Sequence, residues 1–224
     1  MTLFGVYNVQ VLYLLLSVVA FLMALFIAIP FHEFAHAFAA KKEGDYTAYY
    51  MKRYTLAPFA HFDVRGFLFM IFFGFGWAKP VPVDPRNFKR GRRSEFWVSI
   101  AGILMNLALG VVFLSIYYLL WKFFPKVYDI KIYGFLLELF LMYSFSLNFS
   151  LAFFNLLPFY PLDGYNIVKS LSRTDNGYLR FVRQYSFVIM IIFLITGLYS
   201  FYYNYTSGLV IDGLSRLFEI ILRL

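Results

Sequence analysis

The chain alternates between long apolar stretches and short polar connections. Apolar residues dominate four stretches, at about residues 7–40, 96–120, 132–157 and 185–203. A transmembrane helix needs about 20 predominantly apolar residues to cross a hydrocarbon core roughly 30 Å thick. Each stretch meets that requirement, so the pattern predicts an all-α polytopic membrane protein with about four transmembrane helices.

Three segments do not fit a simple spanning helix. The first stretch would give roughly 50 Å of helix at 1.5 Å per residue, so we expect it to protrude or to bend at Pro30. Residues 66–77 are apolar but too short to cross, which predicts a re-entrant or β-hairpin-like loop within a membrane-associated region at about 46–83. Residues 209–224 have polar residues on one side and predict an amphipathic interfacial helix or a short fifth span. We expect residues 1–224 to form a single domain.

Composition agrees with a membrane protein. Of 224 residues, 62% are hydrophobic and only 14% are charged, whereas soluble domains carry about a quarter charged residues. The formal net charge of +8 could suit a nucleic-acid binder. However, the basic residues lie in the short connections, as the positive-inside rule requires, so we expect no nucleic-acid partner.

The distribution of basic residues predicts an orientation. The connections 41–95 and 158–184 hold eleven and four Lys/Arg residues, against three in 122–131 and two in the C-terminal tail. These counts predict a multi-pass protein of the cell membrane with its N-terminus outside and the two basic connections in the cytoplasm.

Candidate chemistry lies in the sequence His-Glu-Phe-Ala-His at residues 32–36. Two histidines four residues apart share one face of a helix and can bind one metal ion. Glu33 is then placed to take a proton from a metal-bound water. Ionisable groups at membrane depth are costly and usually functional. The alternative is that His32 and His36 only hydrogen-bond to neighbouring helices while Glu33 reaches the headgroups.

A catalytic zinc usually has three protein ligands and one water. The chain has no cysteine and only three histidines, so the third ligand must be His61 or a carboxylate. Asp163 follows the third apolar stretch in a turn with Pro161 and Gly164, which can direct its carboxylate back into the bundle. Alternatively, Asp163 caps a following helix. His61 is either a loop residue that contacts headgroups or backbone, or a gate near the metal or substrate.

These motifs resemble the site-2 protease family of intramembrane zinc metalloproteases, over most of the chain. The resemblance rests on four segments in the family's order: HEFAH at 32–36, the loop from His61-Phe62-Asp63 to Gly74-Phe75-Gly76-Trp77-Ala78-Lys79-Pro80-Val81-Pro82-Val83, Ala101-Gly102 with Asn106, and Asn155-Leu-Leu-Pro-Phe-Tyr-Pro-Leu-Asp163-Gly164. The loop is similar to that of the compact prokaryotic branch. Ile103 stands where the family often has Pro, and Tyr165 where a second Gly is common. We expect neither a PDZ domain nor a nucleotide-sensing domain.

The resemblance implies that His32, His36 and Asp163 bind Zn²⁺ and that Glu33 is the general base and later acid. It also implies that Asn155 holds substrate or polarises its carbonyl, although an Asn inside a bundle can simply satisfy backbone groups. Gly74 and Gly76 belong to a loop that we expect to offer an edge strand to an extended substrate.

The predicted function is therefore zinc-dependent endoproteolysis of transmembrane or membrane-proximal segments of membrane proteins. The lipid bilayer and a membrane-protein substrate are the expected partners, and a homodimer is left open. Two alternatives remain, namely a catalytically inactive zinc-binding scaffold in the membrane and, with less support, a transporter.

Overall fold

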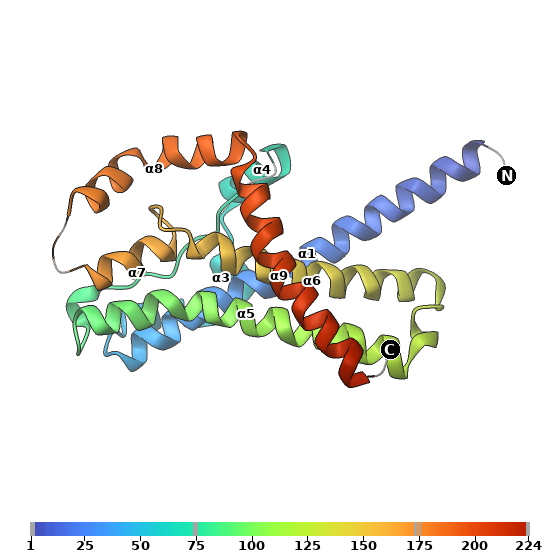
Figure 1. Ribbon diagram of the computed structural model, residues 1–224, viewed down its shortest axis with the longest axis horizontal. Helices are drawn as coiled ribbons and strands as arrows, with labels where there is room; N and C mark the ends of the chain where they lie inside the picture. Colours follow the sequence, from blue (N-terminus) through green and yellow to red (C-terminus); the bar gives the residue numbers. More distant parts are fainter. Residues whose placement is uncertain (1–2, 74–75, 173, 175, 223–224) are drawn as a thin grey trace.

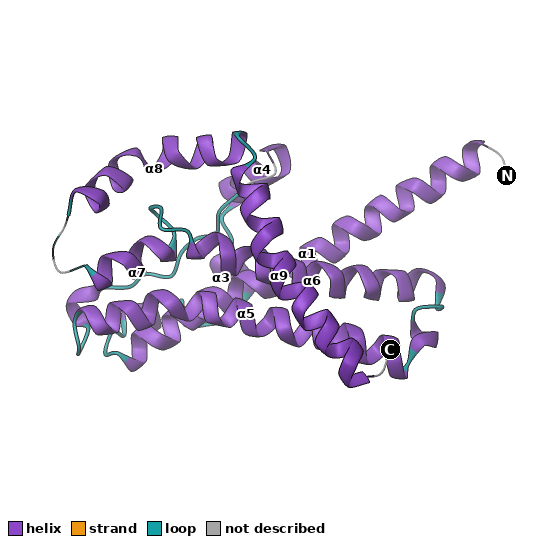
Figure 2. Ribbon diagram, in the orientation of Figure 1, coloured by secondary structure: helices purple, strands orange, loops and turns teal. Residues whose placement is uncertain are grey.

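The computed structural model describes residues 3–73, 76–172, 174 and 176–222. This part of the chain is built from helices and loops, and no strand is assigned within it (Figures 1 and 2). The α-helices are α1 (Leu3–Lys42), α2 (Thr47–Tyr50), α3 (Pro58–His61), α4 (Val64–Phe73), α5 (Arg92–Phe123), α6 (Lys131–Leu156), α7 (Asp163–Leu171), α8 (Gly177–Ile195) and α9 (Leu198–Leu222). Two 3₁₀-helices complete it, η1 (Pro85–Asn87) and η2 (Pro125–Val127).

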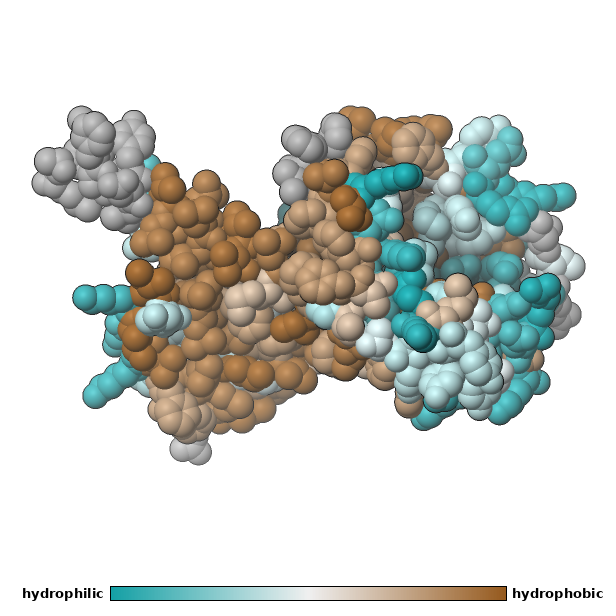
Figure 3. Space-filling view, turned by 180° about the vertical axis from the view of Figure 1, so that it is seen from behind, coloured by the Kyte–Doolittle hydropathy of each residue, from teal (hydrophilic) through white to brown (hydrophobic). Residues whose placement is uncertain are grey.

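In the described part of the chain, four helices are long and apolar enough to cross a membrane, as the sequence predicts. They are Gln10–Lys42 of α1, Arg92–Phe123, Lys131–Leu156 and Gly177–Ile195. One end of the molecule is hydrophilic and adjoins a broad apolar surface (Figure 3). Because such a surface is stable only in lipid, the chain is a multi-pass membrane protein.

Helices α1, α5 and α6 pack together and form the centre of the bundle. Small residues permit this close packing. Ala20, Ala24 and Ala28 of α1 are fully buried, and a Cβ atom at Gly110 of α5 would lie 2.7 Å from the Phe149 ring of α6. Small residues at helix contacts are typical of membrane bundles, where dispersion contacts largely replace the hydrophobic effect.

The membrane-associated segment differs in detail from the expected hairpin. Of the apolar residues 66–77, those up to Phe73 lie in α4, and Trp77 lies back beside the start of that helix, where a Cβ atom at Gly66 would lie 2.0 Å from the Trp77 carbonyl oxygen. The segment thus folds back on itself as a helix, which satisfies its own backbone groups, instead of as a pair of strands. Gly74 lies outside the described residues. After Trp77, residues 78–84 form neither helix nor strand and lead to η1. Three of them precede a proline, which favours extended backbone, so we call residues 78–84 the extended segment.

The C-terminal region also differs from the predicted boundaries. The apolar stretch at 185–203 is interrupted after Ile195, because Gly197 has φ +74°, and α8 gives way to α9. Helix α9 crosses α5 and α6 obliquely (Figure 1). It begins well before residue 209, where we expect the terminal helix to start. It is also not among the four helices of spanning length and hydropathy found in the described residues.

Candidate metal centre

The site joins the last turns of α1 to the first residue of α7. His32 and His36 project from α1, and both are more than nine-tenths buried. Asp163 reaches them because the chain turns sharply after α6. A Cβ atom at Gly164 would lie 2.3 Å from the Leu156 carbonyl oxygen, so only glycine allows this close backbone approach.

Three potential ligand atoms converge at this point. The Nε2 atoms of His32 and His36 lie 3.1 Å apart, and Asp163 Oδ2 lies 3.3 Å from the first and 3.1 Å from the second. Ligands bound to a tetrahedral zinc at 2.0–2.1 Å lie about 3.3–3.4 Å from one another. The triangle therefore has nearly the dimensions of one face of a zinc coordination tetrahedron, and the fourth position remains for water or substrate.

The other imidazole nitrogens fix the orientation of both rings. His36 Nδ1 donates to the Val98 carbonyl oxygen at 2.7 Å, and His32 Nδ1 lies 2.7 Å from Asn106 Oδ1. Because both Nδ1 atoms act as donors, both Nε2 atoms carry lone pairs toward Asp163. Three acceptors that face one another repel unless a cation or proton lies between them. The donor set, two imidazoles and one carboxylate, suits Zn²⁺.

Asp163 is suited to be an ionised ligand. Burial alone would raise the pKa of its carboxyl group. When His36 and His32 each carry a second proton, as they can without a metal, their positive charge and their hydrogen bonds to Asp163 hold that pKa below its usual range. The carboxylate is thus charged at neutral pH, the form in which it binds a metal.

One face of α5 forms the wall of the site. Val98, Gly102 and Asn106 are spaced four residues apart, so they lie in a row along the helix. Gly102 faces the two imidazoles directly. A Cβ atom there would lie 2.4 Å from His36 Nε2 and 2.7 Å from His32 Nε2. A side chain at this position would therefore occupy space that the imidazoles and a bound ion need.

Glu33 lies on α1 beside this centre and is half-buried. Its Oε2 accepts a hydrogen bond of 2.7 Å from the backbone N–H of Val81 in the extended segment. Val81 itself is buried against Ala37 and Ala48. The extended segment is thereby held against the same turn of α1 that carries the candidate site.

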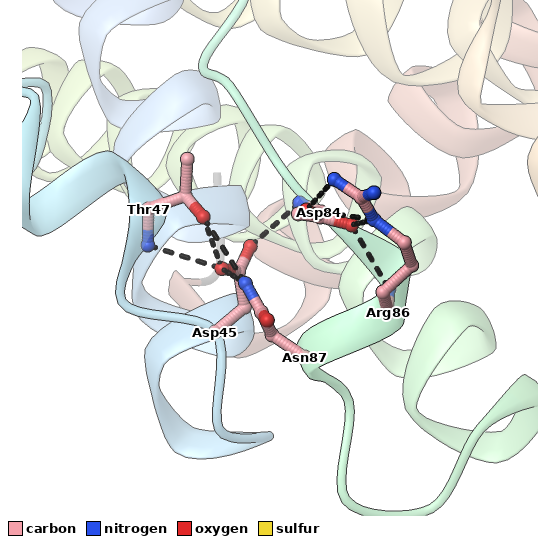
Figure 4. Close-up of polar contacts among 5 residues, drawn as sticks. All are labelled: Asp45, Thr47, Asp84, Arg86 and Asn87. Atoms are coloured by element: carbon pink, nitrogen blue, oxygen red, sulfur yellow. Dashed lines mark hydrogen bonds and ion pairs between the residues drawn. The ribbon is translucent and has the colours of Figure 1, made fainter.

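Both ends of the extended segment are fixed by hydrogen bonds. At Lys79, the N–H donates to the His61 carbonyl oxygen, and Arg53 Nη2 donates to the Lys79 carbonyl oxygen. At Asp84, the N–H donates to Asp45 Oδ2 at 2.8 Å (Figure 4). Asp45 also accepts from Thr47 and Asn87 (Figure 4). The turn after α1 thus anchors the segment that lies next to Glu33.

Comparison with known proteins identifies the family. The model of peptidase family M50 matches residues 20–135 and 125–197. The chain belongs to peptidase family M50. Among curated M50-like relatives, a Bacillus subtilis (strain 168) protein named "Putative zinc metalloprotease YwhC" is 35% identical over 192 residues, which cover 85% of this chain and 87% of the relative.

A Methanocaldococcus jannaschii protein named "Zinc metalloprotease MJ0392" is 26% identical over 157 residues, which cover 70% of this chain and 35% of that protein. No solved structure matches the chain significantly. Membership of M50, the site-2 protease family, confirms the resemblance seen in the motifs. The chain is thus a zinc metalloprotease, and zinc is its expected cofactor.

The remaining candidate residues of this M50 peptidase are held by local contacts. His61 is fully buried, and its Nε2 lies 2.8 Å from the Thr55 carbonyl oxygen. It therefore contacts backbone and not headgroups. Asn155 donates to the Leu151 carbonyl oxygen within its own helix, at 3.0 Å. Among the described residues, only His32, His36 and Asp163 form a metal-sized group. Gly76 is half-buried beside the start of the extended segment.

No function is predicted from the sequence for Gly102 or Asn106, although both belong to the motif Ala101-Gly102 with Asn106. Their four-residue spacing places them on one face of the second span. The polar Asn106 is fully buried at membrane depth, and its partner can only be inferred once α5 is packed against α1. The packing of α5 against α1 is a tertiary contact, and residue spacing within one helix does not predict it.

Proposed function

We propose that this chain is an intramembrane zinc endopeptidase, in which His32, His36 and Asp163 hold the metal and Glu33 acts as general base. The observation that carries the proposal is the convergence of three acceptor atoms within 3.3 Å. Two of these atoms belong to a helix of spanning length and composition. A metal centre in that position acts on peptide bonds inside or at the edge of the bilayer.

Bound zinc would supply a Lewis acid that activates water and polarises the scissile carbonyl. Glu33 takes a proton from the attacking water while the water oxygen bonds to the carbonyl carbon. When the C–N bond breaks, Glu33 passes the proton to the leaving nitrogen, so the carboxylate returns to its starting state. Val98 and Asn106 keep the imidazoles oriented throughout, because each accepts the Nδ1 proton of its histidine.

We also propose that the substrate lies extended along residues 78–84. Alternate residues of an extended chain direct their N–H groups to opposite edges. The N–H of Val81 donates to Glu33, so this edge faces the candidate catalytic group, and a substrate carbonyl would accept this N–H in place of Glu33. On the other edge, Pro80 and Pro82 have no N–H group and cannot donate a hydrogen bond to a substrate. Replacing Gly74 and Gly76 with Val tests whether the preceding loop helps to present this edge, since unchanged cleavage would contradict it.

A transmembrane helix must unwind before its backbone can lie along such an edge. We therefore expect substrates to carry helix-weakening Gly, Pro, Asn or Ser residues near the cut. By the charge counts above, we place the site toward the cytoplasmic side and the N-terminus outside. Water and protons reach the centre from the nearer aqueous side.

Reconstitution with single-span candidate substrates tests the function. The wild type is expected to cleave them at a site that mass spectrometry locates within or next to the span. Glu33→Gln is expected to retain zinc but lose cleavage, because Gln cannot take up a proton. An inactive scaffold would bind zinc without cleavage in the wild type as well, and a transporter would show ion flux that persists in Glu33→Gln.

A further inference from the structure

A second site lies where α1 leaves the apolar part of the molecule. A pocket of about 340 Å³ opens there, next to the end of the span Gln10–Lys42. Its walls combine three lysines with three aromatic rings: Phe38, Lys41, Lys42, Tyr46, Tyr54 and Lys89. All six belong to the described part of the chain, and none carries a carboxylate. The pocket is therefore positively charged and partly apolar.

Aromatic rings hold the lysine ammonium groups in place. Lys41 Nζ lies 4.4 Å from the ring centre of Tyr49 and 4.7 Å from that of Tyr54. Lys42 Nζ lies 4.5 Å from the ring centre of Phe38. A cation–π contact orients an ammonium group but leaves its full charge available to an anion.

The nearest carboxylates are already occupied by other partners. Glu43 pairs with Arg90 and accepts from Ser94, and these contacts, with a smaller contribution from Lys89, hold the pKa of Glu43 below its usual range. Asp45 accepts from Thr47, Asn87 and the Asp84 amide (Figure 4). Within the described residues, no carboxylate forms an ion pair with Lys41, Lys42 or Lys89. Lys41 and Lys42 therefore keep an unneutralised charge, and the charge of Lys89 is offset only in part by Glu43.

The surroundings of the pocket indicate what neutralises this charge. Phe38, Tyr46 and Tyr50 are 41%, 43% and 77% exposed. Tyr side chains are enriched at the headgroup level of a bilayer, which is also where lipid phosphates lie. Clusters of Lys beside the end of a span attract anionic lipid there. We propose that this pocket binds the phosphate group of an anionic phospholipid, with Lys41, Lys42 and Lys89 around it.

This lipid would sit close to the candidate metal centre. Lys41 follows His36 by five residues on the same helix, a rise of about 7–8 Å. A bound headgroup would therefore fix the depth of α1 in the bilayer at the level of the site. The lipid site does not depend on the proposed proteolysis, because it rests on other residues.

Native mass spectrometry and titration with vesicles test the proposal. Wild-type protein is expected to retain phosphatidylglycerol in preference to phosphatidylcholine. The triple variant Lys41→Gln, Lys42→Gln, Lys89→Gln is expected to lose on the order of a hundredfold in affinity for phosphatidylglycerol vesicles, since each surface lysine contributes about fivefold. A triple Arg variant at the same positions is expected to bind like the wild type.

The matched control removes three basic residues outside the pocket, Lys52, Arg65 and Lys79, also by change to Gln. It is expected to lose much less affinity than the pocket variant. An equal loss in both triple variants would overturn the proposal in favour of general surface charge. Equal retention of the two lipids would also overturn it. Displacement by millimolar inorganic phosphate would assign the pocket to a soluble anion instead.

Discussion

Two aspartates, Asp45 and Asp163, show how differently a protein can surround a buried carboxylate. Asp45 is 1% exposed, and its oxygens accept from the Thr47 amide and hydroxyl, the Asp84 amide and the Asn87 side chain (Figure 4). Asp163 instead faces the Nε2 atoms of His32 and His36. A carboxylate surrounded by donors needs nothing more, whereas one that faces other acceptors needs a cation.

The largest expected effect comes from Asp163→Ala. Removing one of three ligands should lower zinc affinity by well over a hundredfold, more than the loss of an outer-shell partner, and cleavage should fall with it. Inductively coupled plasma mass spectrometry of the purified variant measures the zinc, and digestion of a single-span substrate measures the activity. Asp45→Ala is the matched control, and it should retain one zinc per chain. Full zinc content in Asp163→Ala would remove Asp163 from the ligand set.

A somewhat smaller effect is expected from Gly102→Ala, which adds one methyl group to the wall of the site. The new Cβ atom would collide with both Nε2 atoms unless α5 moved away from α1. We expect zinc affinity to fall by about 10–100-fold, as for other changes that disturb the orientation of ligands. Competition with a fluorescent zinc chelator measures this affinity.

Gly177→Ala is the control for Gly102→Ala, because a Cβ atom at Gly177 would have no neighbour within 4 Å. Its zinc affinity should equal that of the wild type. If both variants bound zinc normally, the close approach of α5 to the imidazoles would not limit the metal site. The contrast between Asp45 and Asp163 would then rest on their hydrogen-bond partners alone and not on the packing of α5 around the site.

Much of the candidate metal centre can be predicted from the sequence, because its signals are local. The spans follow from the length of apolar stretches, and the His32–His36 pair follows from the four-residue period of a helix. Asp163 needs an additional argument, since 127 residues separate it from His36. The Pro-rich turn and Gly164 indicate a reversal of the chain, but only the packing of α7 on α5 puts the carboxylate next to the imidazoles.

Other features depend on tertiary contacts and could not be predicted. The role of Gly102 requires knowing that α5 touches α1 at that turn. The composition of residues 66–77 is compatible with either a hairpin or a helix. The close approach of the Trp77 backbone to Gly66, which accompanies the helix, is a contact that composition does not predict. The helix break at Gly197 lies inside an apolar stretch that reads as continuous. The saturation of Asp45 by donors involves residues 84 and 87, about 40 positions away.

The smallest effect, and the sharpest test of the contrast, is expected from Asp45→Asn in metal-stripped protein. Burial alone would raise the pKa of Asp45, but hydrogen bonds from Thr47, Asn87 and the Asp84 amide hold it below its usual range. A carboxyl whose pKa is lower in the folded state stabilises that state above its unfolded pKa of about 3.9, and this contribution is lost as the pH falls through the folded pKa. At pH 7 we expect the variant to lose about 1–3 kcal/mol of unfolding free energy.

Thermal unfolding in detergent at a series of pH values measures this difference. The gap in Tm between wild type and Asp45→Asn should be full at pH 7. It should narrow below about pH 4, where the Asp45 carboxyl of the unfolded wild-type chain begins to take up a proton while the folded one stays ionised. Stripping the metal from both proteins separates this effect from the release of zinc by protonated histidines. If the difference in Tm stayed constant down to about pH 3, the four donors would not be stabilising the charged form of Asp45.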